Sequence, residues 1–388
     1  MNIIYIQDQE IDRCNGDYYH SKSEHFFVRY LSGISDNDTF TVYCGIKEII
    51  DERIIQNYKK ISHSRIKYIQ IPEFRKLRNL YRIYKQIKLA VKNADFCYLR
   101  SGIASSIAGI ICQKCKIPYM AIVNEDIYKN MKNHSNFFFK LSAYPLSWFT
   151  HHMIRNANYA CYVTQDYLQS RYPCNGESLG CSDIEFLELN DAIVDKRIER
   201  ILKKTVPIIL GSVGSVSTRI KGQDTVIRAL AQLKKRGIVN YRYHLVGTGN
   251  LQYLRNFSEE LGVADMIVFL GEYSHDNVLK WFETIDIYIH PSRSEGLPRT
   301  ILEAMTKATT CVCSDVGGIP ELINNEYLFR YNGNEVEDLI NILLKIDIKR
   351  MKEESVRNYE RAKMYAPQAL SERRRLFFES AIKMVRKR

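Results

Sequence analysis

The chain has 388 residues, of which 45% are hydrophobic and 26% are charged, and its formal net charge is +12. This length favours two domains of ordinary size, and this composition excludes a disordered or fibrous chain. The positive charge favours an anionic partner, either nucleic acid, a phosphorylated substrate or an anionic membrane surface, although a lysine-rich composition accounts for part of it.

The first residues and the cysteines indicate where the protein works. Residues 1–6 lack a basic region followed by a long apolar run, so they are predicted to form a first strand and not a signal peptide. No apolar run is long enough to span a bilayer. The ten cysteines, including the pair Cys112 and Cys115, show no pattern of zinc ligands or disulfides. We therefore expect a cytoplasmic protein that is either soluble or peripheral at the inner face of the cell membrane.

The first half alternates short β-rich runs with longer helical patterns. The predicted strands cover 2–6, 40–43, 66–71, 96–99, 119–123 and 159–163. The predicted helices cover 22–33, 47–60, 74–93, 102–116 and 136–157. This alternation predicts a parallel sheet that is covered by helices on both faces.

The second half repeats the same design after a polar stretch at 182–204, which we interpret as the interdomain connection. The predicted strands cover 208–211, 243–246, 267–269, 287–290, 310–313 and 327–329. The predicted helices cover 222–236, 250–262, 275–284, 299–307 and 335–346, and a last helical pattern covers 367–388. The alternation again predicts a parallel sheet with covering helices.

The most informative motif is HPSRSEGLPRTILEA at residues 290–304. A predicted buried strand ends at His290, a turn with Gly296 follows, and a helix begins after it. Loops at the carboxyl ends of strands in open α/β sheets bind ligands, and free N–H groups at a helix start hold phosphate oxygens. Glu295 lies in this loop and Glu303 in the helix, with seven residues between them.

Glu295 and Glu303 resemble the EX7E motif of retaining GT-B glycosyltransferases, especially of glycosyltransferase family 4. Two neighbouring runs are similar to that family as well, namely IKGQD at 220–224 and VGGIPE at 316–321. The resemblance is close from about residue 207 to residue 321 and loose in the first half. In the first half, the pattern is similar to bacterial surface-polysaccharide enzymes of the same family.

The resemblance implies an α/β fold of the GT-B type, with two Rossmann-like domains that face a central cleft. It implies an acceptor-binding domain at 1–185 and a donor-binding domain at 206–366. A C-terminal helix at 367–388 would return to the N-terminal domain.

The resemblance also implies roles at the matching positions. Glu295 would hold hydroxyls of the donor sugar, and Glu303 would hold the ribose hydroxyls. Lys221 would neutralise the diphosphate as it leaves, and the backbone near Tyr273 would border the base. The other implied donor-binding residues are Gly247, Gly296, Leu297, Arg299 and Thr300.

Three departures from the family pattern stand out. Ser215 occupies the position where many relatives carry an arginine, and nearby Arg219 either replaces that arginine or is merely solvated. Ala308 and Thr310 stand where the family usually has glycine and proline, which concerns the shape of that loop. The histidine that the N-terminal domain of relatives often supplies has no evident counterpart here.

In the first half, Arg100 ends one predicted strand, and Glu125 and Asp126 follow the next. By resemblance, Arg100 would orient a phosphate of the acceptor or donor, and Glu125 or Asp126 would act on the acceptor hydroxyl. An arginine–carboxylate pair that only braces the loops explains the pattern equally well. Gly16 either lets the acceptor approach the backbone or simply forms a turn.

The function that the resemblance implies is a retaining, metal-independent transfer of a hexose-type sugar. The partners would be a nucleotide-diphosphate sugar and a glycan or polyprenyl-diphosphate-linked acceptor, with no cofactor and no nucleic acid. Asp36 and Asp38 have the spacing of a metal-binding DxD motif, but a polar turn is the simpler interpretation. The alternatives are a nucleotide-sugar epimerase of GT-B fold and a non-catalytic basic binding protein.

Basic and aromatic residues also predict contact with a membrane surface. Between residues 59 and 92 there are eleven lysines or arginines and one acidic residue. The helical pattern at 74–93 contains an apolar stripe and a separate basic stripe. A second candidate is the run 137–141 with Trp148 and Phe149. The competing interpretation is that the apolar stripe packs on the sheet and the charges are only solvated. The basic stripe consists of Arg75, Arg78, Arg82, Lys85 and Lys92, and the apolar stripe of Phe74, Leu77, Leu80, Tyr81, Tyr84, Ile87 and Val91.

Overall fold

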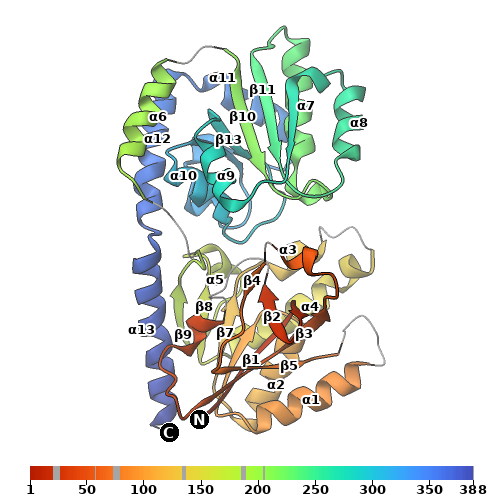
Figure 1. Ribbon diagram of the computed structural model, residues 1–388, viewed down its shortest axis with the longest axis vertical. Coiled ribbons are helices and arrows are strands. Elements are labelled where there is room, and N and C mark those ends of the chain that lie inside the picture. Colours follow the sequence, from red (N-terminus) through yellow and green to blue (C-terminus); the bar gives the residue numbers. More distant parts are fainter. Residues whose placement is uncertain are drawn as a thin grey trace. The chain divides into compact units, whose positions relative to one another are not determined.

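The computed structural model describes residues 1–20, 27–56, 58–72, 79–132, 137–184, 189–203 and 206–387. The chain divides into two compact units (Figure 1). Among the described residues, unit 1 consists of the chain up to Cys181 together with the segment from Leu370 onward, and unit 2 consists of Ser182–Ala369.

Unit 1 is built on a mixed sheet. In addition to its main path of strands, β3 pairs with β1, and β5 pairs with β3. Its main path runs in the order β4-β2-β1-β6-β7-β8-β9, in which the pairs β1–β2 and β2–β4 are antiparallel and the others are parallel. The six predicted strands are present, as β1, β3 and β5 to β8. The strands are β1 (Asn2–Cys14), β2 (Asp17–His20), β3 (Thr39–Glu48), β4 (Lys59–Lys60), β5 (Ile66–Gln70), β6 (Phe96–Arg100), β7 (Tyr119–Val123), β8 (Tyr159–Tyr162) and β9 (Glu177–Gly180).

The helices of unit 1 include the predicted helices α1, α2 and α4. The prediction of a helix at 47–60 is wrong, because β3 continues to Glu48 beside the second half of β1 and a short 3-10 helix and β4 follow. Of the predicted helix at 22–33, the structure shows a 3-10 turn, and residues 21–26 lie outside the described residues. The helices are α1 (Leu80–Lys92), α2 (Ile103–Cys115), α3 (Ile127–Lys132), α4 (Phe137–Arg155), α5 (Tyr167–Arg171) and α13 (Pro367–Arg386), with 3-10 turns η1 (Val28–Leu31) and η2 (Glu52–Ile55).

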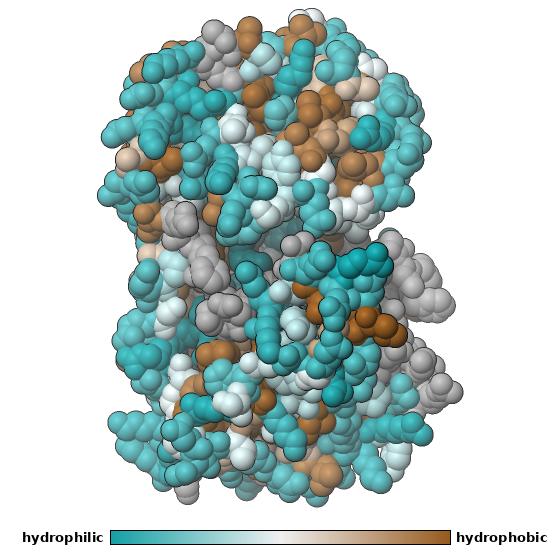
Figure 2. Space-filling view, viewed as in Figure 1, coloured by the Kyte–Doolittle hydropathy of each residue, from teal (hydrophilic) through white to brown (hydrophobic). Residues whose placement is uncertain are grey.

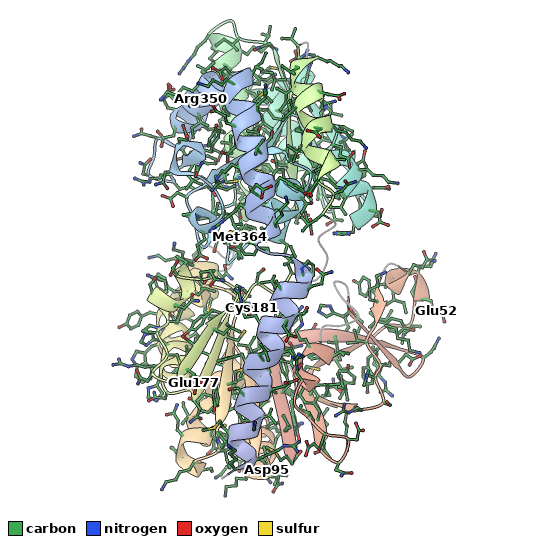
Figure 3. The ribbon with its side chains drawn as sticks, turned by 90° about the vertical axis from the view of Figure 1, so that its left-hand side faces the viewer. Glu52, Asp95, Glu177, Cys181, Arg350 and Met364 are labelled. Atoms are coloured by element: carbon green, nitrogen blue, oxygen red, sulfur yellow. The ribbon has the colours of Figure 1, made fainter. Side chains whose placement is uncertain are left out.

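The last helix, α13, supplies part of the core of unit 1 (Figure 3). Phe378 is fully buried and stacks on Tyr30 with ring centroids 5.6 Å apart, and it lies equally close to Tyr98. The Cys181 thiol donates to the carbonyl of Leu370 at 3.4 Å. The sheet of unit 1 therefore packs against a helix that comes from the other end of the chain.

Unit 2 is built on a parallel sheet with the order β12-β11-β10-β13-β14-β15. All six predicted strands and all five predicted helices of this half are present. The strands are β10 (Ile208–Val213), β11 (Tyr241–Val246), β12 (Ile267–Gly271), β13 (Ile287–His290), β14 (Thr310–Ser314) and β15 (Leu328–Phe329). The helices are α6 (Ala192–Leu202), α7 (Gln223–Lys235), α8 (Gln252–Glu260), α9 (His275–Phe282), α10 (Arg299–Thr306), α11 (Glu335–Lys345) and α12 (Ile348–Lys363), with 3-10 turns η4 (Arg219–Lys221), η5 (Ala264–Met266), η6 (Ile319–Glu321) and η7 (Asn325–Tyr327).

The stretch at 182–204 is more than the predicted connection, because it contains α6, which packs on α12 within unit 2. Buried Arg197 on α6 donates to the carbonyls of Phe282 at 2.7 Å and Ile285 at 2.6 Å. It also donates to the carbonyl of Lys307 and to the hydroxyl of Thr309. α6 is therefore a structural helix of unit 2, held to the ends of α9 and α10.

The surface of both units is mostly hydrophilic on the face drawn in Figure 2, and apolar side chains there form small groups. Each unit encloses its own buried apolar side chains, such as Tyr98 in unit 1 and Tyr288 in unit 2. Among the described residues, no helix has both the length and the apolar character that crossing a membrane requires.

Candidate active site

Two loops of unit 2 meet because the strands before them are neighbours. β10 and β13 pair in parallel, so the loop after β10 and the loop after β13 leave the same edge of the sheet. The backbone N–H of Arg293 donates to the carbonyl of Ile220 at 2.7 Å. The Arg293 guanidinium donates to both carboxylate oxygens of Asp224, each at 2.9 Å. This bidentate pair fixes the loop that carries Glu295 to the loop that carries Lys221.

Two glycines allow the close packing of these loops. Gly222 has a φ of 68°, and a Cβ there would lie 1.8 Å from the carbonyl oxygen of Pro291. Gly317 has a φ of 61°, and a Cβ there would lie 2.1 Å from the carbonyl oxygen of Glu295. Any larger residue would both strain the backbone and push the loops apart. The glycines of the IKGQD and VGGIPE motifs therefore have a steric explanation in the structure.

Glu295 is the centre of a small charged network. Its Oε1 accepts from Lys221 Nζ at 2.7 Å and lies 3.2 Å from His290 Nε2. Burial alone would raise the pKa of Glu295, but the hydrogen bonds from His290 and Lys221 and the positive charge of Lys221 outweigh it and lower that pKa to about 2. The carboxylate is thus ionised at neutral pH, and two of the residues named from the sequence, Glu295 and Lys221, are in direct contact.

Glu303 lies in the middle of α10, almost fully buried, and faces the beginning of α9. His275 Nε2 is 3.4 Å from Glu303 Oε1. The hydrogen bond to Glu303 and its negative charge raise the pKa of His275 above its usual value. The carboxylate that the resemblance assigns to the ribose therefore has a histidine partner, which the sequence analysis did not identify.

The other predicted donor-binding residues lie in the loops and helix starts of unit 2. Arg299 and Thr300 begin α10, and Leu297 is buried before it. In the described part of the chain, no side chain caps the first turn of α10, so its N–H groups can meet a ligand. The Gly296 carbonyl accepts from the N–H of Gly318 at 2.6 Å, the Gly247 N–H donates to Gly271, and Tyr273 lies between β12 and α9.

Two departures from the family pattern have a visible outcome. Arg219 is exposed, and its guanidinium lies 4.5 Å from the centre of the Tyr253 ring on α8. In this structure Arg219 is therefore not simply solvated but contacts an aromatic ring. Ala308 has a φ of 50°, so the backbone keeps the left-handed turn that a glycine would favour.

Asp126 of unit 1 is buried and fully engaged. It accepts from the hydroxyls of Tyr167 at 2.7 Å and Tyr172 at 2.8 Å and pairs with Arg171 at 3.3 Å. Burial would raise the pKa of Asp126, but these partners and a backbone N–H lower it overall. These contacts are those of an arginine–carboxylate pair that braces the loops. The arginine of the pair is Arg171 and not Arg100.

Arg100 and Glu125 have other partners. Arg100 Nη1 donates to Gln7 at 3.4 Å, and its Nε and Nη2 donate to the side-chain oxygen of Asn124 at 2.9 and 2.6 Å when that amide is oriented with its oxygen toward the guanidinium. Glu125 accepts from Asn130 at 2.7 Å. Gly16, with a φ of 85°, forms the two-residue turn between β1 and β2, so the turn interpretation describes it.

Asp8 is a carboxylate at this edge that sequence analysis missed. It follows the core part of β1 and accepts from the N–H groups of Ile103 at 2.5 Å and Ala104 at 2.9 Å, so it caps α2. Burial raises its pKa to about 6. Asp8 lies inside β1 (Asn2–Cys14), so a rule that singles out polar residues directly after a strand does not find it.

The DxD spacing of Asp36 and Asp38 has a structural explanation. Asp36 is exposed and pairs with Arg65, whereas the side chain of Asp38 is buried and accepts from the Ser35 hydroxyl and the amino group of Met1. Across the described ranges of the chain, no three metal-binding side chains gather in one place.

All ten cysteines are free thiols, and Cys112 and Cys115 lie on α2.

Comparisons with known proteins show the family of one domain and the fold of the chain. Residues 194–363, most of unit 2, match the family described as glycosyl transferases group 1. Protein CapJ of Staphylococcus aureus is 26% identical over 85% of this chain and 83% of its own length. The lipopolysaccharide core biosynthesis mannosyltransferase LpcC of Rhizobium leguminosarum is 32% identical over 30% of this chain and 33% of its own length.

Solved structures show the same fold. Sucrose-phosphate synthase from Thermosynechococcus elongatus has a TM-score of 0.65 at 15% identity and covers 96% of both chains. Anabaena Alr3699/HepE in complex with UDP-glucose has a TM-score of 0.61 at 17% identity and covers 96% of this chain and 98% of its own. Residues 194–363 therefore form a glycosyl transferases group 1 domain within unit 2, and the chain as a whole has the GT-B fold.

Proposed function

We propose that the chain is a retaining glycosyltransferase that moves a hexose-type sugar from a nucleotide-diphosphate sugar to a hydroxyl of a glycan or of a polyprenyl-diphosphate-linked glycan. The observation that carries this proposal is the contact between Lys221 and Glu295 at the uncapped start of α10, with Glu303 on the same helix. A cation and free N–H groups suit a diphosphate, and ionised carboxylates suit sugar hydroxyls.

The chemistry follows from the charges that develop. The bond between the anomeric carbon and the diphosphate oxygen breaks, the diphosphate gains negative charge, and the sugar gains oxocarbenium character. Lys221 and the N–H groups of α10 would stabilise the leaving diphosphate without a metal ion. The acceptor oxygen would attack from the same face, and its proton would pass to the leaving phosphate, so the configuration is retained.

The comparisons support the class of substrate without fixing it. LpcC is named as a mannosyltransferase of lipopolysaccharide core biosynthesis, and the HepE structure contains UDP-glucose. By analogy, we propose a role in bacterial surface polysaccharide synthesis. An epimerase would instead release an altered free sugar without an acceptor, and a nucleic-acid-binding protein would bind RNA with a steep salt dependence.

Replacing the two glutamates separately tests the assignment. Glu303→Ala should weaken the binding of nucleoside diphosphate by about 10- to 150-fold, the effect of losing a charged hydrogen bond. Glu295→Ala should keep that binding, because Lys221 stays available to the diphosphate, but it should abolish sugar transfer. Isothermal titration and a transfer assay measure the two effects, and Glu259→Ala, an exposed glutamate on α8, is the control.

Wild-type transfer rates in both variants would contradict the proposed function. EDTA should leave the rate unchanged, whereas loss of activity with EDTA and recovery with manganese would contradict the metal-independent mechanism.

We also propose that unit 1 docks on an anionic membrane surface through α1 and α4. On α1, the buried stripe is formed by Ile83, Ile87, Ala90 and Val91. Tyr81, Tyr84 and Leu89 are exposed on the same helix as Arg82, Lys85, Lys88 and Lys92, so the predicted apolar stripe is in fact divided between core and surface. Arg75, Arg78, Phe74 and Leu77 lie outside the described residues.

α4 presents a second exposed apolar group. Leu141, Tyr144, Trp148 and Phe149 are exposed by 40 to 74% of their surface, beside Lys140. The side chains of the run at 137–139 lie outside the description. α1 and α4 both pack beside α2. Aromatic rings next to lysine and arginine are typical of surfaces that lie at a bilayer interface.

Co-sedimentation with liposomes tests this docking. Binding should require anionic lipid, decrease with salt, and fall at least several-fold when Arg82 and Lys85 become glutamine or when Tyr144 and Trp148 become serine. Lys345→Gln with Lys349→Gln on unit 2 is the charge-matched control. Equal binding to neutral and anionic vesicles would contradict the proposal and would leave the donor site untouched.

A further inference from the structure

His290 is enclosed within unit 2 and uses both of its ring nitrogens. It is 3% exposed and lies at the last position of β13. Its Nδ1 is 2.9 Å from the Tyr288 hydroxyl, and its Nε2 is 3.2 Å from Glu295 Oε1. The Thr300 side chain, at the start of α10, hydrogen-bonds to the same tyrosine hydroxyl. A continuous polar chain therefore joins α10 to Glu295 behind the loop.

The chemistry of these groups fixes the direction of each hydrogen bond. An ionised carboxylate only accepts hydrogen bonds, so Nε2 carries the proton toward Glu295. In the neutral ring, Nδ1 is then the acceptor, and the Tyr288 hydroxyl donates to it. Tyr288 thus selects the tautomer in which His290 is a donor to Glu295.

Glu295 needs this partner when the donor binds. In the structure, Oε1 is shared by Lys221 and His290. Among the described residues, Oε2 has no hydrogen-bond partner, so it can accept a hydrogen bond from a ligand. Once a diphosphate attracts Lys221, a buried carboxylate without a second partner would be unstable or turn away. His290 comes from the strand and cannot follow the diphosphate.

We propose that His290 is a positioning residue that holds Glu295 through Oε1 while Lys221 engages the diphosphate, so that Oε2 faces the donor sugar. This inference rests on the proposed function. It assigns the tautomer-selecting role to Tyr288, and neither residue touches the reacting atoms. The consequence is that His290 acts on the sugar and not on the nucleotide.

The test compares sugar-dependent and nucleotide-dependent steps in three variants. His290→Phe keeps a ring of similar size but removes the donor, and it should lower kcat for transfer by about 10- to 150-fold, the effect of one charged hydrogen bond. Its Kd for the nucleoside diphosphate should stay within about twofold. His290→Gln, whose amide nitrogen reaches a position similar to Nε2, should recover at least about tenfold of the lost kcat. Tyr288→Phe should lower kcat less than His290→Phe does.

His244→Gln, a half-buried histidine on β11, controls for removing an imidazole from the same sheet, and circular dichroism of every variant reports folding. Equal kcat in wild type and folded His290→Phe would overturn the inference and leave the proposed function standing. An equal loss in His290→Phe and His290→Gln, or a parallel loss of nucleotide affinity, would also overturn it. If the wild type itself transfers no sugar from any nucleotide sugar, both the proposed function and this inference fail.

Discussion

Glu295 illustrates how much of a site a motif can predict. Its place in the EX7E pattern and the lysine at 221 are both visible in the sequence, but their contact depends on the neighbouring positions of β10 and β13. His275 belongs to no motif, and His290, which begins the motif at 290–304, was interpreted only as the end of a strand. The role of each becomes visible only as the partner of a glutamate. Ala308 shows the converse, since the departure from glycine changes the residue and not the left-handed backbone.

The lowered pKa of Glu295 predicts a pH effect on stability. A carboxylate whose pKa is about 2 in the folded protein and near 4.5 in the unfolded chain stabilises the fold above pH 4.5. That contribution, at most about 3 kcal/mol, is lost as the pH falls toward 2. The free energy of unfolding of unit 2 should therefore fall more steeply below pH 4.5 in the wild type than in Glu295→Gln. Urea titrations between pH 7 and pH 2.5 measure it, and parallel pH profiles would contradict the prediction.

At the scale of elements, the regular parts were predictable and the irregular parts were not. The strands β7 and β13 match the predicted ranges because they are short, apolar and buried. β1 was predicted to end at residue 6, because polar residues follow, yet pairing with β2 and β3 carries it to Cys14. α6 was taken for a connection because its surface is charged and its anchoring contact is an arginine.

Arg197 on α6 should contribute strongly to the stability of unit 2. Burial lowers the pKa of Arg197 to about 10, so the guanidinium is still charged at neutral pH. It donates hydrogen bonds to several backbone carbonyls. Arg197→Ala should lower the free energy of unfolding of unit 2 by roughly 3–5 kcal/mol, because those acceptors lose their donor. Lys196→Ala, an exposed neighbour on the same helix, should change it by less than about 0.5 kcal/mol. Chemical denaturation measures both, and similar values for the two variants would refute this role of α6.

At the scale of the whole molecule, α13 makes unit 1 discontinuous in sequence. Phe378→Ala should therefore destabilise unit 1 by about 3–5 kcal/mol, the usual effect of truncating a buried phenylalanine. Its thermal transition should fall by roughly 10 °C, whereas nucleoside diphosphate binding by unit 2 should stay unchanged. Lys383→Ala, exposed on the same helix, is the control. A loss of nucleotide binding in Phe378→Ala would show that the two units do not respond independently.

The discontinuity of unit 1 also affects how the protein is made. Tyr30 and Tyr98, which receive Phe378, are synthesised early, and the 188 residues of Ser182–Ala369 must be translated before α13 emerges. At about 5–20 residues per second, this interval lasts roughly 10–40 s. During that time unit 2 can complete its sheet on the ribosome. The aromatic surface of Tyr30 and Tyr98, which α13 later covers, is then exposed to solvent. We expect the nascent chain to need a chaperone at this surface, and the need to end when the final helix docks.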